Sequence, residues 1–210
     1  MINIKKFCVG PIYVNTYIVN DFKTKKAIII DPGGENELIL QYLNENNLQT
    51  EFIIATHGHI DHVAGAKELC NELNLPFYLN SLELNNLELS KLVAPKYGYL
   101  DFEIPEVYFD LNENTQLSIG NVAIKIISTP GHTAGGISLL IDEKLFSGDT
   151  IFFESIGRCD LPGGHEGTLL KTIQDKIFSL PGEIIIFPGH GQQTSVAYEK
   201  ESNPYIYSNG

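Results

Sequence analysis

The chain contains the sequence Thr56-His57-Gly58-His59-Ile60-Asp61-His62, in which three histidines and one aspartate fall within a few residues of each other. The apolar run Phe52 to Ala55 comes directly before it and predicts a buried strand that ends there. Residues two apart in an extended or loop backbone point the same way, so the imidazoles of His57 and His59 can converge. Imidazole and carboxylate groups suit zinc and other first-row divalent ions. The stretch therefore predicts a metal site.

Asp61 and His62 lie at the turn into a helix that we expect to begin near Val63, where they are free to face a second ion. One loop cannot fully hold either ion, so further ligands are expected at other strand ends. Polar residues stand in that position at three places, each after a glycine, which permits a sharp turn. The sequence thus predicts seven metal ligands for two ions: His57, His59, Asp61, His62, His132, Asp149 and His190.

Short apolar runs between turn signals predict buried strands at 13–19, 27–30, 52–55, 77–79, 122–127, 137–141 and 184–187. Helical spacing is found at 35–46, 62–73 and 167–180. Strands and helices therefore mix throughout, which indicates an α/β or α+β fold. Several polar loops, including Asp31-Pro32-Gly33-Gly34, follow directly after strands, where ligands tend to bind in such sheets. The segment 81–108 is the least regular and is expected to be an insertion flanking the site or an oligomer contact.

The length of 210 residues predicts a single domain over 1–210 with a substantial core. The net charge of −12 argues against a nucleic-acid partner, which needs a basic surface. The apolar runs are too short to span a bilayer and the first residues do not form a signal peptide, so we expect no membrane partner and a cytoplasmic location. Cys8, Cys70 and Cys159 have no C-x-x-C spacing and fit a reducing compartment. His165 is expected to be merely exposed, and Cys159 to be a packing residue or a bystander.

In this order and spacing, the motifs resemble the metallo-β-lactamase superfamily, from about Phe7 to the C-terminal region. The resemblance implies an αββα four-layer sandwich with the metals at one edge, between the two sheets. It implies two divalent ions, zinc by default with iron or manganese as alternatives. The first ion would take His57, His59 and His132. The second would take Asp61, His62 and His190, with Asp149 bridging the two.

The carboxylate at Asp149 resembles glyoxalase II, whereas most true β-lactamases have a cysteine there. The stretch Gly157-Arg158-Cys159-Asp160-Leu161-Pro162-Gly163-Gly164 is similar to the short bacterial glyoxalase II-like hydrolases. Arg158 stands where glyoxalase II carries a basic residue that contacts glutathione, so the resemblance implies that Arg158 binds substrate. Only residues 191–210 follow His190, whereas full glyoxalase II has a C-terminal helical domain.

The resemblance implies a metallo-hydrolase in which a metal-bridging hydroxide cleaves a small-molecule thioester such as S-lactoylglutathione. Asp61 and Asp149 are the expected catalytic residues, with Asp61 orienting the water, and the protein is expected to be a monomer or homodimer. Two alternatives stay open: a persulfide dioxygenase with one iron, and a hydrolase of a small molecule that is not a thioester. The dioxygenase branch typically has a Gly-Arg-Thr-Asp-Phe loop, whereas this chain has Gly157-Arg158-Cys159-Asp160-Leu161, which favours the hydrolase. A non-enzymatic metal scaffold is disfavoured because structural zinc sites usually close with cysteine.

Overall fold

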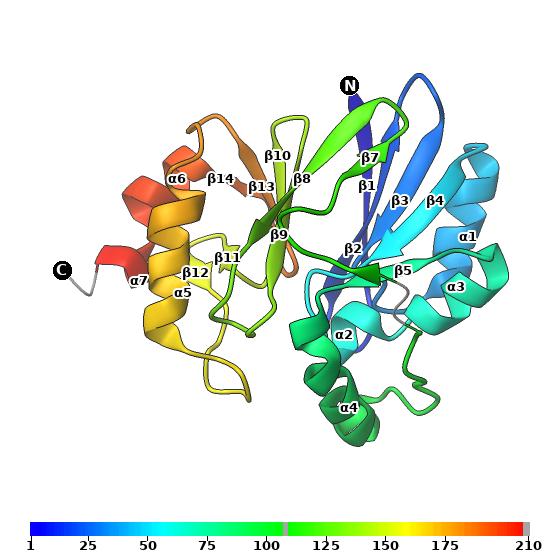
Figure 1. Ribbon diagram of the computed structural model, residues 1–210, viewed down its shortest axis with the longest axis horizontal. Coiled ribbons are helices and arrows are strands. Elements are labelled where there is room, and N and C mark those ends of the chain that lie inside the picture. Colours follow the sequence, from blue (N-terminus) through cyan, green and yellow to red (C-terminus); the bar gives the residue numbers. More distant parts are fainter. Residues whose placement is uncertain (107–108, 208–210) are drawn as a thin grey trace.

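Two six-stranded sheets lie face to face in the computed structural model, which describes residues 1–106 and 109–207 (Figure 1). The first has the order β1 (Ile2–Val9), β2 (Val14–Asp21), β3 (Lys26–Ile30), β4 (Gln49–Ile54), β5 (Phe77–Leu79) and β6 (Phe109–Asp110). The second has the order β14 (Thr194–Ser195), β13 (Ile185–Pro188), β10 (Lys144–Gly148), β9 (Ile137–Ile141), β8 (Val122–Ser128) and β7 (Leu117–Ile119). A short hairpin of β11 (Ile151–Phe152) and β12 (Ser155–Ile156) follows β10.

Helices lie on the outer side of each sheet (Figure 1). Beside the first sheet are α1 (Asn36–Glu45), α2 (Ile60–Val63) and α3 (Ala66–Leu73). After β5 the chain forms η1 (Ser81–Glu83), α4 (Leu84–Val93) and η2 (Ala94–Tyr97), and α4 lies beyond the end of the sheet, at the bottom of Figure 1. Beside the second sheet are α5 (Glu166–Thr172), the π-helical turn η3 (Ile173–Ile177), α6 (Val196–Ser202) and α7 (Pro204–Tyr207). This helix–sheet–sheet–helix order confirms the expected αββα four-layer sandwich.

The apolar runs in the sequence reflect sheets that are buried on both faces. In β3, Ile28 and Ile30 belong to the cluster packed between the sheets, while Ala27 and Ile29 belong to the cluster under α1 and α3. Successive side chains of a strand point to opposite faces, so burial of both faces requires an unbroken apolar run. A third cluster under α5 contains Leu169 and covers the outer face of the second sheet.

Some predicted boundaries differ from the structure. The helix predicted at 62–73 is two helices, α2 and α3, because Gly65 separates them and its carbonyl accepts a hydrogen bond from Asn36 Nδ2 at 3.1 Å. Asp61 and His62 lie within α2, which begins at Ile60 rather than near Val63.

The segment predicted to be irregular, 81–108, is helical throughout 81–97, and residues 107–108 lie outside the described part of the chain. Strand β1 was not predicted; most of its side chains are half-buried or exposed, so it lacks the continuous apolar run of the inner strands. Among the described residues, no helix is long and apolar enough to cross a membrane.

Candidate metal centre

The predicted ligands come together because five loops leave their strands at one edge of the two sheets. In the first sheet β3 and β4 are parallel, and in the second β10 and β13 are parallel, so each pair of carboxyl ends meets at the same edge. The loop after β4 carries the histidine-rich stretch, and α2 follows it. The loops after β8, β10 and β13 carry His132, Asp149 and His190, respectively. The fifth loop, after β3, begins with Asp31.

Two glycines allow these loops to approach each other closely. Gly148 has φ +49°, and a Cβ there would collide with the Thr56 hydroxyl of the other sheet. A Cβ at Gly189 would collide with Asp149 Oδ1 and would lie 2.7 Å from His62 Cε1. Glycine at both positions therefore lets the two sheets bring their ligands within reach of one another.

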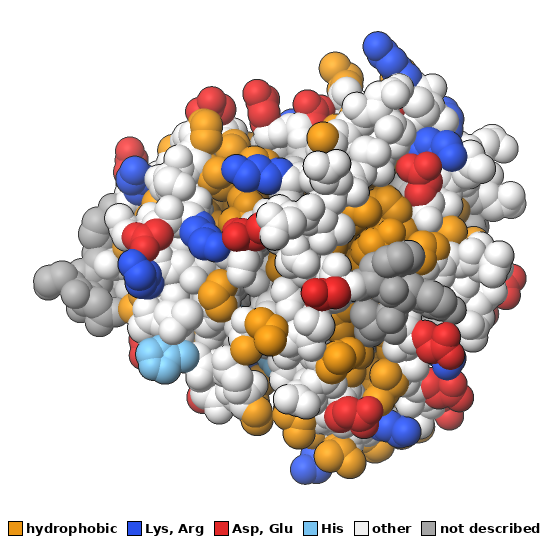
Figure 2. All heavy atoms as spheres, viewed as in Figure 1, with side chains coloured by type: hydrophobic (Ala, Val, Ile, Leu, Met, Phe, Trp, Pro, Cys, Tyr) orange, Lys and Arg blue, Asp and Glu red, His pale blue; other side chains and the backbone are white. Residues whose placement is uncertain are grey.

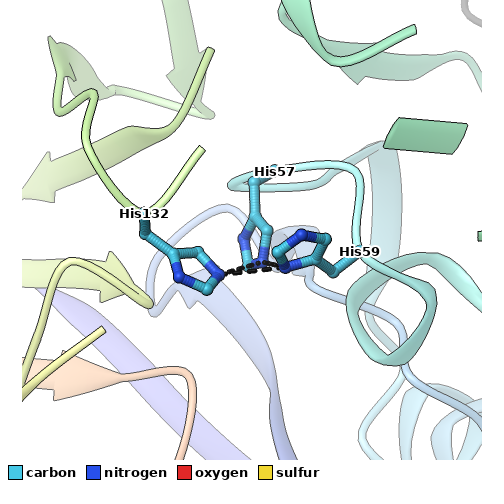
Figure 3. A group of neighbouring side chains, drawn as sticks. All are labelled: His57, His59 and His132. Atoms are coloured by element: carbon cyan, nitrogen blue, oxygen red, sulfur yellow. Dashed lines mark hydrogen bonds between the residues drawn. The ribbon is translucent and has the colours of Figure 1, made fainter. Parts of the chain in front are cut away.

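The first group of side chains consists of His57, His59 and His132, whose ring nitrogens point at one another (Figure 3). His132 Nε2 lies 3.2 Å from His57 Nε2 and 2.9 Å from His59 Nδ1, and the last two nitrogens are 3.1 Å apart. The convergence predicted for His57 and His59 is therefore present, and His132 joins them from the second sheet.

The outer hydrogen bonds of this group assign two tautomers. His132 Nδ1 lies 2.7 Å from the carbonyl of Arg158, which can only accept, so the proton is on Nδ1. Thr56 Oγ1 donates to Asp31 Oδ2 at 2.9 Å and therefore accepts from His57 Nδ1 at 3.1 Å. The Nε2 atoms of His57 and His132 thus face each other with lone pairs, an arrangement that suits a cation between them.

The second group consists of Asp61, His62 and His190. His190 Nε2 lies 3.1 Å from Asp61 Oδ2, and His62 Nε2 lies 3.6 Å from the same oxygen. The residues are oxygen and nitrogen donors, and His62 Nε2 is buried without a hydrogen-bond partner, so this group also fits a divalent ion.

Asp149 lies between the two groups. Its Oδ2 atom is 3.6 Å from His132 Nε2 and 3.7 Å from His190 Nε2, while Oδ1 is 3.3 Å from His62 Nε2. Asp149 Oδ1 is buried and has no hydrogen-bond partner. The carboxylate is therefore within reach of both groups.

The two groups differ in electrostatics. Burial, together with the neighbouring imidazoles, lowers the pKa of His57 well below its ordinary 6.5, and burial and His132 lower that of His59 to about 4. Burial acts in the same direction on His62, but the carboxylates of Asp149 and its neighbours outweigh it and raise the pKa of His62 well above 6.5. His57 and His59 are thus held neutral by their surroundings, whereas the second group is rich in negative charge.

Two buried carboxylates support the ligands and were not assigned from the sequence. Asp31 accepts hydrogen bonds from Thr56 N at 2.7 Å and Thr56 Oγ1 at 2.9 Å, and its Oδ2 lies 3.0 Å from His62 Nδ1. Asp31 therefore contacts His62 of the second group directly, and it reaches His57 of the first group through the Thr56 hydroxyl. The position of Asp31 directly after a predicted strand was a usable signal, since the other strand-end loops supply ligands.

The second carboxylate is Glu83, which is fully buried at the junction of η1 and α4. Glu83 Oε2 accepts from Gly58 N at 2.9 Å and from Asn86 Nδ2 at 2.7 Å, and Oε1 accepts from Gly135 N at 2.6 Å. Glu83 therefore ties the His57–His59 loop to the loop that follows His132. Nothing in the local sequence indicated this role.

A cavity of about 490 Å³ opens beside the cluster and includes five of the predicted ligands in its wall. Arg158, the predicted substrate-binding residue, also lines it. The guanidinium of Arg158 donates two hydrogen bonds of 2.7 Å to Asp160, and its side chain is 57% exposed.

His165 and Cys159 lie outside the cluster. His165 is exposed, as expected, and its Nδ1 accepts from Thr168 N at 3.1 Å, so it caps the N-terminus of α5. Burial, followed by nearby Glu166 and Asp160, raises the pKa of the Cys159 thiol, which disfavours the reactive thiolate.

A four-layer sandwich with two adjoining His/Asp groups at one edge defines a metal-dependent protein with a dinuclear centre. The family model described as "Metallo-beta-lactamase superfamily" matches residues 9–190, and the chain belongs to this superfamily.

Individual relatives are similar over nearly their whole length. The hydroxyacylglutathione hydrolase GloC of Haemophilus influenzae is 36% identical over 190 residues, which cover 88% of this chain and 89% of the relative. The crystal structure of the B3 metallo-β-lactamase BLEG-1 has a TM-score of 0.90 and 32% identity, covering 98% of this chain and 100% of the other. TTHA1623, solved in a di-iron-bound form, has a TM-score of 0.86 and 33% identity, covering 96% and 99%.

Proposed function

We propose that this protein is a thioester hydrolase with two divalent ions, and that hydroxyacyl-glutathione thioesters such as S-lactoylglutathione are the first substrates to test. The observation that carries the proposal is Asp149, a carboxylate within 3.7 Å of histidines from both groups. The relative named as a hydroxyacylglutathione hydrolase supports the choice of substrate.

In this proposal His57, His59 and His132 would hold one ion, Asp61, His62 and His190 would hold the other, and the Asp149 carboxylate would be a ligand to both. Two such ions supply an activated water at neutral pH and polarise a carbonyl oxygen. Zinc is the default from the ligand types, and the di-iron form of TTHA1623 supports iron as an alternative.

The chain's own residues would orient the reactants. Asp61 is buried and its Oδ2 lies 3.1 Å from His190 Nε2, at the cavity wall, where the carboxylate can accept a hydrogen bond from water. A thiolate leaving group departs without strong acid assistance, so the site needs no separate proton donor.

The test combines metal analysis with activity. Protein purified without added chelator should hold two metal ions per chain by mass spectrometry, and should hydrolyse S-lactoylglutathione or other acyl thioesters. Asp149→Asn should lower kcat/KM at least about 100-fold. The control variant Asp175→Asn replaces an exposed aspartate of η3 and should leave kcat/KM unchanged.

Two further assays separate the alternatives. One iron per chain, with oxygen consumption on glutathione persulfide and no thioester cleavage, would establish the dioxygenase instead. Cleavage of a chromogenic β-lactam without thioester cleavage would establish a hydrolase of another small-molecule class, an outcome included because of the similarity to BLEG-1.

A further inference from the structure

The cavity beside the metal ligands is walled mainly by apolar side chains from several segments. Leu89 and Val93 of α4 form one wall, and Phe152 and Ile156 of the β11–β12 hairpin form another. Apolar side chains also gather on the surface over α4, at the bottom of Figure 2. A substrate group in this cavity would therefore be bound chiefly by burial of apolar surface.

The uncharged polar side chains of the wall are largely engaged with the protein itself. Asn86 Nδ2 donates to Glu83 at 2.7 Å, and Ser90 Oγ donates to the Gly58 carbonyl at 2.9 Å. Both residues are buried, so these hydrogen bonds are part of the packing of α4 against the histidine loop. The hydroxyl of Tyr97 adds one more uncharged polar group.

The part of the wall that the structure describes offers an anionic substrate group only one cationic side chain besides the histidines, and this cation is already paired. Among the described residues, Arg158 is the single lysine or arginine that lines the cavity, and its guanidinium donates two hydrogen bonds to Asp160. The two carboxylates of a glutathione thioester would therefore compete with Asp160 for this cation. The remaining charged side chains of the wall, apart from the histidines, are the carboxylates of Asp61 and Asp149, whose negative charge the two proposed ions would offset.

From the apolar wall, its engaged polar groups and its paired cation, we infer that this cavity selects thioesters whose larger group is apolar and uncharged, over glutathione thioesters. The inference rests on the proposed thioester hydrolysis and specifies the substrate class of the same site. Because a hydrophobic pocket gains affinity with each methylene buried, alkyl and aryl acyl groups should be the preferred occupants.

Competing thioesters test the inference on the metal-loaded full chain. The hexanoyl and acetyl thioesters of N-acetylcysteamine, a small neutral thiol, should be compared with S-lactoylglutathione. We expect kcat/KM for the hexanoyl thioester to exceed that for the acetyl thioester and for S-lactoylglutathione by at least about ten-fold. A higher kcat/KM for S-lactoylglutathione would overturn the inference and leave the thioester hydrolase intact.

A matched pair of variants on α4 links the preference to the cavity wall. Leu89→Asn should reduce the hexanoyl-to-acetyl ratio of kcat/KM by about ten-fold. Leu92→Asn makes the same change on the same helix at a side chain that is 73% exposed and is not part of the wall, so it should keep the ratio. Equal ratios in the two variants would overturn the inference.

Binding without turnover separates the two proposals. The hexyl thioether of N-acetylcysteamine cannot be hydrolysed, and calorimetry should show it binding more tightly than S-methylglutathione, with the difference reduced in Leu89→Asn. If it binds in this way but no thioester is cleaved, the proposed function fails and the apolar selectivity of the cavity stands. If thioesters are cleaved but the two thioethers bind equally, the selectivity fails and the function stands.

Discussion

Asp31 Oδ2 lies 3.0 Å from His62 Nδ1, and both side chains are almost completely buried. The carboxylate lies behind the imidazole, and on the other side of the ring His62 Nε2 faces Asp61 and Asp149 at 3.6 and 3.3 Å. A carboxylate behind a metal-binding imidazole also raises its basicity and hence its strength as a ligand. Asp31 therefore acts on the second group although it is not itself one of the predicted ligands.

Replacing Asp31 with asparagine should weaken binding of the second ion by about 10- to 100-fold, because the amide removes the negative charge behind His62. Metal retention against a chelator, followed by mass spectrometry, measures the change. Asp21→Asn is the matched control, since Asp21 is equally buried but caps a turn with Thr24 at 2.8 Å, away from the cluster. Equal metal loss in both variants would contradict the role of Asp31.

Replacing Glu83 with glutamine should weaken the other ion's site, formed by His57, His59 and His132. In the wild type the backbone N–H groups of Gly58 and Gly135 each donate to one oxygen of Glu83. In the variant the side-chain NH2 group of glutamine would replace one of these oxygens and leave one backbone N–H without an acceptor. An unsatisfied buried group costs about 1 to 3 kcal/mol. We expect a lower free energy of unfolding and, in metal titrations, weaker binding of the ion at the site formed by His57, His59 and His132.

The control for Glu83→Gln is Glu88→Gln, the same change at an exposed position of α4. If Glu83→Gln lowers thermal stability but its metal titrations match those of the wild type, Glu83 has a purely structural role. Loss of the first-site step alone would support its role in positioning the two loops.

The contrast between these carboxylates and the ligands shows what the sequence could predict. The ligands His57 to His62 are close in the chain, and His132, Asp149 and His190 each follow a glycine at the end of a strand, so local pattern was enough to select them. Their convergence then followed from the parallel strands that end at one edge.

Glu83 could not be selected in this way, because its partners Gly58 and Gly135 are 25 and 52 residues away and lie on loops of different sheets. Glu83 sits in the least regular segment of the sequence, 81–108, where leucines alternate with polar residues, and its burial arises only when α4 packs over the histidine loop. The break at Gly65 was missed for the same reason, since it depends on contact with Asn36 from α1.

Acid should weaken the two metal sites at different pH. A proton competes with the ion for each imidazole nitrogen, and the folded-state pKa of His62 is raised above 6.5 while that of His59 is lowered to about 4. As pH falls from about 8 to about 5, the apparent affinity of the second site should therefore decline first. Metal titrations across this range measure the order, and an earlier decline at the first site would contradict it.

Asp160 should oppose the binding of anionic thioesters. Its hydrogen bonds from Arg158 lower the pKa of the Asp160 carboxyl to about 2, so it stays ionised at neutral pH and keeps the guanidinium neutralised. Asp160→Asn removes that charge and leaves Arg158 free to bind a substrate carboxylate in bidentate fashion. Because the pair is exposed and solvent screens it, we expect only about a two- to five-fold lower KM for S-lactoylglutathione, with no change for the neutral hexanoyl thioester.

The control for Asp160→Asn is Asp175→Asn, which breaks a similarly exposed ion pair with Lys171 and should change neither KM. An equal fall in KM for both substrates in Asp160→Asn would show that the variant alters the cavity itself rather than the availability of Arg158.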